Sequence, residues 1–189
     1  MATTGPVSSL GARLRAGRGA AGVRRAVPGQ VPGGRVVGGR VPEAEVIPAS
    51  EELGISQVVF SPIAQGVLTG KYRPGQAPPE GSRATDEKGG GANFISRWMK
   101  DDVLSRVQEL KPIADDLGLS MAALAVAWVL QEENVAAAII GASRPEQVAG
   151  NVAASGVRLE PDVKARIDEV LAPVAQTDPA LTRSPDPRP

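Results

Sequence analysis

Two short apolar segments constrain what this chain can fold into, because each has the composition of a β-strand. The first covers residues 56–60 and the second covers residues 135–140. Both are followed by a glycine-containing loop and then by helical patterns. Strand–helix alternation of this kind predicts an α/β fold with a parallel sheet. The second segment, apolar throughout, is expected to be buried within that sheet.

Helical patterns fill most of the remaining chain between residues 41 and 173. Pro48 should kink or restart the first of them. The predicted helices cover residues 43–53, 101–117, 121–131, 144–154 and 161–171, and the third is apolar nearly all round, which indicates burial on several sides. Two parallel strands alone do not make a stable sheet, so the pattern indicates that strands are missing.

Residues 61–100 form a long connection that is rich in Gly and Pro. A structureless stretch of that length inside a domain is usually functional or disordered. Residues 174–189 are rich in Pro, Thr and Asp, and we expect them to be a disordered tail.

The first 40 residues differ in composition from everything that follows. They contain seven arginines, ten glycines and no acidic residue, although the whole chain has 21 basic and 21 acidic residues. Such a segment cannot bury enough apolar surface to fold, so we expect disorder. An Arg/Gly-rich contact to nucleic acid is the alternative. It is disfavoured because this segment holds no aromatic residue for base stacking.

The chain contains no cysteine and no histidine. This composition excludes disulfides, thiolate chemistry and the commonest acid/base and metal-ligating side chain, and no metal site is expected. A membrane-spanning run of about 18 apolar residues is absent, as is the apolar core of a secretory signal. The sequence therefore predicts a soluble, cytoplasmic protein.

The run SPIAQGVLTGKY, at residues 61–72, directly follows the first predicted strand. Ligands of βα folds bind at the carboxyl ends of strands. Glycine allows a ligand to approach the backbone closely, Lys71 can neutralise a phosphate, and Tyr72 can stack on a ring or donate a hydrogen bond. An ordinary turn with a solvated lysine explains the same residues equally well.

A second run, GASRPEQVAGN at residues 141–151, follows the second predicted strand and opens a helix. Ser143 and Glu146 have the spacing of a capping box. Arg144 at a helix N-terminus suits an anion, and Gln147 and Asn151, one turn apart, suit a base edge. Plain helix capping with a solvated Arg144 is the alternative. Both runs should share one face of the sheet, as in the phosphate site of a (β/α)₈ barrel.

Five segments in this order resemble the aldo/keto reductase family, most of all the branch that contains the potassium-channel beta subunits. They are RVPEAEVIP at residues 40–48, the run at residues 61–72, GSRA at residues 81–84, AALAVAWVL at residues 122–130 and IIGASRPEQVAGN at residues 139–151. The resemblance covers about residues 40–173. It implies the C-terminal portion of a (β/α)₈ TIM barrel, with these strands as the last two, and extended NADP(H) as cofactor.

The resemblance also implies roles for individual residues. Near the nicotinamide and pyrophosphate it places Ser61, Pro62, Ile63 and Gly66. A loop that straps the cofactor would use Lys71, Tyr72 and Arg83. The adenosine phosphate would meet Gly141, Ser143 and Arg144, and the adenine would meet Gln147 and Asn151. One departure is Gly150, where family members usually carry Glu before the Asn.

The family reduces carbonyls with a Tyr proton donor, tuned by Lys and Asp, and a His or Asn that orients the substrate. All four precede the segments matched here, and Tyr72 is the only tyrosine of this chain. We therefore expect a truncated or frame-disrupted family member, with residues 1–40 out of frame or mis-started. The expected function is an NADP(H)-dependent oxidoreductase for carbonyl or alcohol substrates that lacks its catalytic tetrad. The alternative is a non-catalytic NADP(H)-binding or interaction module. Unpaired strand edges would favour oligomers.

Overall fold

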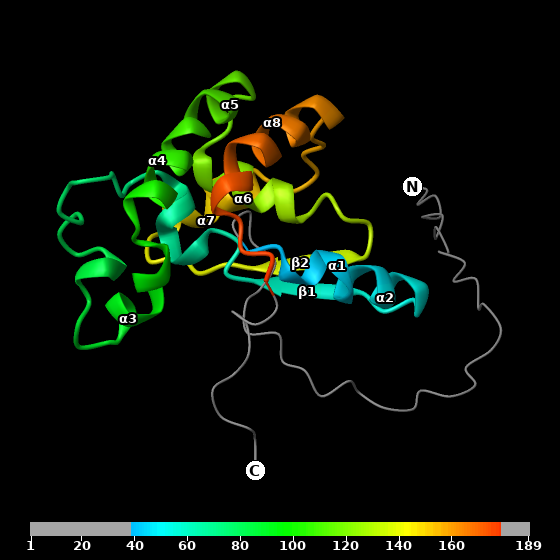
Figure 1. The fold of residues 1–189 in the computed structure, drawn as a ribbon, viewed down its shortest axis with the longest axis horizontal. Coiled ribbons are helices and arrows are strands. Elements are labelled where there is room, and N and C mark those ends of the chain that lie inside the picture. Colours follow the sequence, from blue (N-terminus) through cyan, green and yellow to red (C-terminus); the bar gives the residue numbers. More distant parts are fainter. Residues whose placement is uncertain (1–38, 179–189) are drawn as a thin grey trace, which may run out of the picture.

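The computed structural model describes residues 39–178 of the chain. Within them, β1 (Gln57–Phe60) and β2 (Val135–Ile139) pair in parallel, with Phe60 opposite Ile139 (Figure 1). The register is irregular between Gln57 and Val58. Parallel pairing confirms the predicted βα arrangement, and each strand lies within one residue of its expected bounds.

The segment before β1 folds as two short helices, α1 (Val41–Ala44) and α2 (Val46–Glu52). They meet at Glu45, so the expected break at Pro48 is wrong by three residues. Pro48 lies in the first turn of α2. A missing N–H there removes no intrahelical hydrogen bond, and proline is tolerated.

The long connection between β1 and the next predicted helix is not structureless. It contains η1 (Ala64–Thr69), η2 (Arg83–Thr85), α3 (Gly91–Ile95) and η3 (Ser96–Trp98). Ile95 and Trp98 are buried, and their apolar side chains anchor the connection to the core. Local hydrophobic anchors therefore order a segment whose Gly and Pro content alone suggested otherwise.

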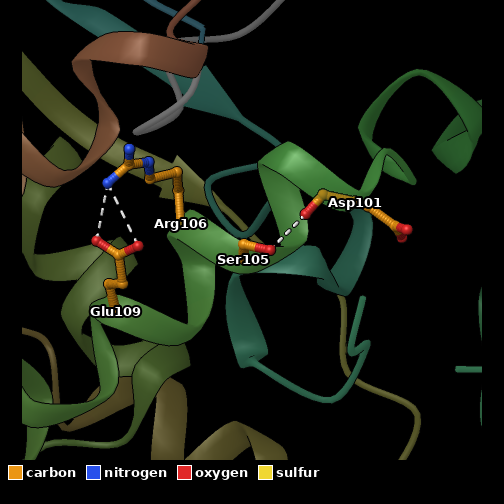
Figure 2. Close-up of polar contacts among 4 residues, drawn as sticks. All are labelled: Asp101, Ser105, Arg106 and Glu109. Carbon is orange, nitrogen blue, oxygen red and sulfur yellow. Dashed lines mark hydrogen bonds and ion pairs between the residues drawn. The ribbon is translucent and has the colours of Figure 1, made fainter. Parts of the chain in front are cut away.

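The helix expected at residues 101–117 is interrupted at Leu110, which separates α4 (Asp101–Glu109) from α5 (Lys111–Asp116). Pro112 has no N–H and cannot continue the hydrogen-bond ladder. Figure 2 shows the exposed side of α4: Ser105 Oγ donates to the Asp101 carbonyl at 2.7 Å, and Arg106 pairs with Glu109 at 3.0 Å. Such exposed pairs contribute only about 0.2–0.5 kcal/mol.

Helix α6 (Met121–Val129) is the centre of the core, as its all-round apolar pattern predicted. Ser120 caps it by accepting a hydrogen bond from the Ala123 N–H at 3.1 Å. Every residue of α6 except Ala122 is buried. The chain then continues through β2, α7 (Pro145–Val152), α8 (Pro161–Leu171) and η4 (Ala172–Val174). In Figure 1, α4, α5, α6 and α8 lie on one side of the strand pair.

The two strands are less buried than their composition predicts. Val58, Phe60 and Ile139 are 57%, 47% and 62% exposed. Val59, between Val58 and Phe60, is buried in the core cluster that also contains residues of α6, because alternate side chains of a strand point to opposite faces. The expected burial of the second strand is therefore wrong for the described residues, whose sheet has one covered face.

The two ends of the described region contact each other. The Arg40 N–H donates to the Gln176 carbonyl at 2.9 Å, and its guanidinium lies 2.5 Å from Asp168 and 4.8 Å from the centre of the Trp128 ring. Gln176, in the segment expected to be a disordered tail, also forms an isolated parallel β-bridge with Gly39. The predictions for residues 1–38 and 179–189 lie outside the described residues.

In the described part of the chain, no single helix is long and apolar enough to cross a membrane. The α4–α5 segment and α6 reach that length only as a pair bent by 89°.

Candidate functional site

A cavity of about 730 Å³ lies at the carboxyl ends of β1 and β2. Its walls come from the turn after β1, the strap (residues 81–86) and the segment from the end of β2 to α7. Its lining residues are Phe60, Ser61, Pro62, Ile63, Gln65, Gly66, Thr69, Lys71, Gly81, Ser82, Arg83, Asp86, Ala122, Ile139, Ile140, Gly141, Ala142, Ser143, Gln147 and Asn151. The volume is in the range of small-molecule and cofactor sites.

The turn after β1 is conformationally strained. Ser61, Ala64 and Gln65 have φ values of 54°, 47° and 60°, in the left-handed region that non-glycine residues rarely adopt. Each such residue costs about 1–2 kcal/mol. Backbone strain of this kind persists only where surrounding contacts determine it, and it concentrates at ligand sites.

Side-chain hydrogen bonds connect this strained turn to the strap. Gln65 Nε2 donates to Ser61 Oγ at 2.8 Å, and Arg83 Nη1 donates to Gln65 Oε1. Gln65 was absent from the sequence-predicted site. Its signal in the sequence was only its place between Ile63 and Gly66, inside a predicted ligand loop.

Lys71 lies across Gly66. A Cβ built on Gly66, whose φ is 100°, would be 3.4 Å from Lys71 Cε and 3.5 Å from its Nζ. The same Nζ lies 5.1 Å from the centre of the Tyr72 ring, within cation–π range. The tyrosine supports the lysine from the core side.

Tyr72, which was expected to hold the cofactor together with Lys71 and Arg83, lies outside the cavity lining. Its side chain is 1% exposed and belongs to the hydrophobic core. Among residues 39–178, its hydroxyl has no hydrogen-bond partner. The aromatic ring gains more from burial with its apolar neighbours than from a solvated position on the loop.

The turn after β2 differs from the predicted capping box. Helix α7 begins at Pro145, its N-cap is Arg144, and within the described residues no side chain caps it. Gln147 Oε1 accepts from the Ser143 N–H at 2.7 Å and from its Oγ at 3.2 Å. Ser143 therefore donates to Gln147 and does not form a capping box with Glu146. Proline at the first helical position moves the N-cap one residue along the chain, to Arg144. Arg144 is exposed and lies outside the cavity lining.

The family model for the aldo/keto reductase family matches residues 36–172. The chain belongs to the aldo/keto reductase family. This finding confirms that the five segments resemble this family. The cavity therefore lies in a chain whose family contains oxidoreductases.

Curated relatives of this chain include a probable voltage-gated potassium channel subunit beta from Arabidopsis thaliana, 40% identical over 131 residues. The match covers 68% of this chain and 39% of that relative. An L-glyceraldehyde 3-phosphate reductase from Escherichia coli O157:H7 is 35% identical over 120 residues, which cover 63% of this chain and 34% of the relative. The chain therefore spans less than half the length of the curated relatives it matches.

Among solved structures, a glycerol dehydrogenase from Gluconobacter oxydans matches with a TM-score of 0.53 and 24% identity. The match covers 78% of this chain and 41% of the other. This likeness concerns the fold alone. Together with the family, it implies the (β/α)₈ barrel fold, to which the described residues contribute two parallel strands.

The structure gathers ten of the twelve predicted site residues of this chain around one cavity. They are Ser61, Pro62, Ile63, Gly66, Lys71, Arg83, Gly141, Ser143, Gln147 and Asn151. Tyr72 and Arg144 are the two exceptions. Gln65, Thr69, Ser82 and Asp86 also line the cavity, although they were not among the predicted site residues.

Two features of the cavity indicate the chemistry of its ligand. Among the described residues, two cations, Lys71 and Arg83, and one carboxylate, Asp86, line the cavity, and this excess of positive charge favours an anion. Ser82 is 7% exposed, and its Oγ has no partner among residues 39–178, so a buried hydroxyl remains unsatisfied at the wall. In the same part of the chain, no group of three or more His, Cys, Asp or Glu side chains is placed to hold a metal ion.

Proposed function

We propose that this cavity is the NADP(H) site of an oxidoreductase that acts on carbonyl or alcohol substrates. The observation that carries the proposal is the convergence of residues 61–71, residues 81–86 and residues 139–151 on one cavity with two cations. A dinucleotide needs such a site, with charge for its phosphates and apolar walls for its rings.

The residues that line the cavity fit a dinucleotide. Lys71 and Arg83 would contact phosphate oxygens, and the buried Ser82 hydroxyl would supply a further hydrogen bond. Phe60, Ile63 and Ile139 offer an apolar surface for a flat ring. Gln147 and Asn151 carry amides that suit the adenine edge.

When bound, NADPH supplies a hydride for reduction of a carbonyl. The residues described here would bind and orient it, and their contribution is alignment of the reacting ring and neutralisation of phosphate charge. Ser61 and Gly66 would do so from the strained turn, which we expect to keep the same conformation with and without cofactor. Preorganised positioning of this kind lowers the entropic cost of the reaction.

We further propose that this chain alone does not catalyse hydride transfer from NADPH to a carbonyl. A positioned proton donor is worth about 10²–10⁴ in rate. The sequence contains no histidine, and its one tyrosine, Tyr72, is buried away from the cavity. Under this proposal the chain acts as a cofactor-binding unit, and hydride transfer depends on groups supplied by a complementing polypeptide.

Titration of the purified chain with NADPH, followed by nicotinamide fluorescence, tests the proposal. We expect saturable binding that weakens about tenfold in Lys71→Met, the factor for one lost charge-assisted contact. Lys164→Met, on α8 and outside the cavity lining, is the matched control and should bind like the original chain. Equal titration curves for both variants would contradict the assignment of the site.

A second measurement tests whether the chain is catalytically active or only binds the cofactor. Consumption of NADPH with an aromatic aldehyde should stay at the rate of the protein-free mixture, because no proton donor is positioned. Turnover that depends on Lys71 would show that the chain is an enzyme in its own right. Absence of NADPH binding would refute both functions.

A further inference from the structure

We propose that Gln65 is a positioning residue that locks the strap onto the strained turn and holds Arg83 over the anion subsite. We call its two hydrogen bonds, to Ser61 and from Arg83, the Gln65 latch. The inference deepens the proposed function and rests on it for the identity of the anion. Gln65 has this role even if it does not contact the ligand, because it acts through Arg83.

The geometry of the latch spans three parts of the cavity wall. Gln65 Nε2 donates to Ser61 Oγ, where β1 ends, and Gln65 Oε1 accepts from Arg83 on the strap. All three residues line the cavity. The carboxamide is suited to this task because one end donates and the other accepts.

The backbone of Gln65 adopts a conformation that non-glycine residues rarely adopt. Its φ and ψ are 60° and 20°, a left-handed conformation that glycine adopts without strain and glutamine does not. The contacts of the side chain offset that strain. They direct it back to Ser61, four residues earlier, and outward to the strap.

The far side of the strap is fixed independently. A Cβ built on the buried Gly91, at the start of α3, would be 2.9 Å from the Arg83 carbonyl oxygen and 2.9 Å from Asp86 Oδ2. Strap and α3 are therefore in direct backbone contact. Gln65 supplies the contact on the cavity side, where the exposed Arg83 side chain would otherwise sample many rotamers.

The neutrality of Gln65 matters for ligand binding. A carboxylate at this position would hold the guanidinium equally well but would cancel its charge. A carboxamide orients the guanidinium and leaves its positive charge and its remaining N–H donors for an anionic ligand. Position and charge can therefore be separated by substitution.

Hydrogen exchange of the full chain, without nucleotide, tests the latch directly. In Gln65→Met we expect backbone amides of residues 81–86 to exchange at least about tenfold faster, because the strap loses its cavity-side contact. Gln65→Glu should retain the original protection. Gln65→Gly, which relieves the left-handed strain and so should fold, must release the strap as Gln65→Met does. Gln76→Met, an exposed glutamine outside the cavity lining, is the control.

NADPH affinity then shows how the latch acts. Gln65→Met and Gln65→Glu should each raise the Kd about tenfold, the first by misplacing Arg83 and the second by cancelling its charge. In an Arg83→Met background, Gln65→Met should have no further effect, because its action passes through Arg83. Additive losses in that background would overturn the positioning role. So would unchanged exchange of residues 81–86 in Gln65→Met, a result that stands whether or not the chain binds NADPH.

Discussion

The turns after β1 and β2 occupy equivalent places at the ends of paired strands, yet they are built differently. The first holds three left-handed non-glycine residues and buries Ala64, Gly66, Val67 and Leu68. The second is exposed from Gly141 to Glu146. Its side-chain hydrogen bonds, among the described residues, are those of Gln147 with Ser143. From this difference we predict that the first turn is the rigid half of the candidate site and the second turn is the adaptable half.

The largest expected difference between the two turns concerns their arginines. Arg83→Met should weaken NADPH binding about thirtyfold, which corresponds to about 2 kcal/mol for a charge-assisted contact. Arg144→Met should change the Kd by less than about twofold, because Arg144 lies outside the cavity lining. Fluorescence titrations of both variants provide the measurement. A larger loss for Arg144 would show that the second turn reorganises around the ligand.

A smaller difference should appear between the glycines of the two turns. Gly66→Ala should lower the free energy of unfolding by about 1–2 kcal/mol, because its φ of 100° is strained for a residue that carries a Cβ. Gly141 has ordinary φ, and no described atom lies within 4 Å of its added Cβ. Gly141→Ala should therefore change stability by at most about 0.5 kcal/mol. Urea unfolding of both variants decides whether the first turn is the rigid one.

The core support of the first turn can be tested at Tyr72. Tyr72→Phe should raise the free energy of unfolding by about 1 kcal/mol, because it removes a buried hydroxyl that has no partner within residues 39–178. The ring and its contact with Lys71 remain, so NADPH affinity should stay unchanged. A loss of affinity on this substitution would place the hydroxyl at the ligand after all.

The smallest effect is expected at Gln147. Its contacts with Ser143 are exposed, so Gln147→Met should change the free energy of unfolding by less than about 0.5 kcal/mol. Thermal or urea unfolding measures this change. Destabilisation comparable to that of Gly66→Ala would remove the distinction between the rigid and the adaptable turn.

Sequence reasoning located the strands, α6 and α8 because their hydrophobic periods are strong and local. Ten of the predicted site residues line one cavity, because the carboxyl ends of parallel strands meet at the same edge of a sheet. Sequence reasoning failed where tertiary contacts decide. The burial of Tyr72, the outward position of Arg144 and the N-cap shift before Pro145 depend on packing and on the exact start of a helix. Which faces of β1 and β2 are buried also depends on the elements that pack against them, and the composition of a strand does not specify those elements.

The contact between Arg40 and Gln176 has a practical consequence, because it brings the entry and exit of the described region within 2.9 Å. Circular permutation is tolerated best where two chain ends lie close together. The same closeness would let a short peptide join the two ends, so that new termini could be opened at an exposed turn such as Gly75–Ala77.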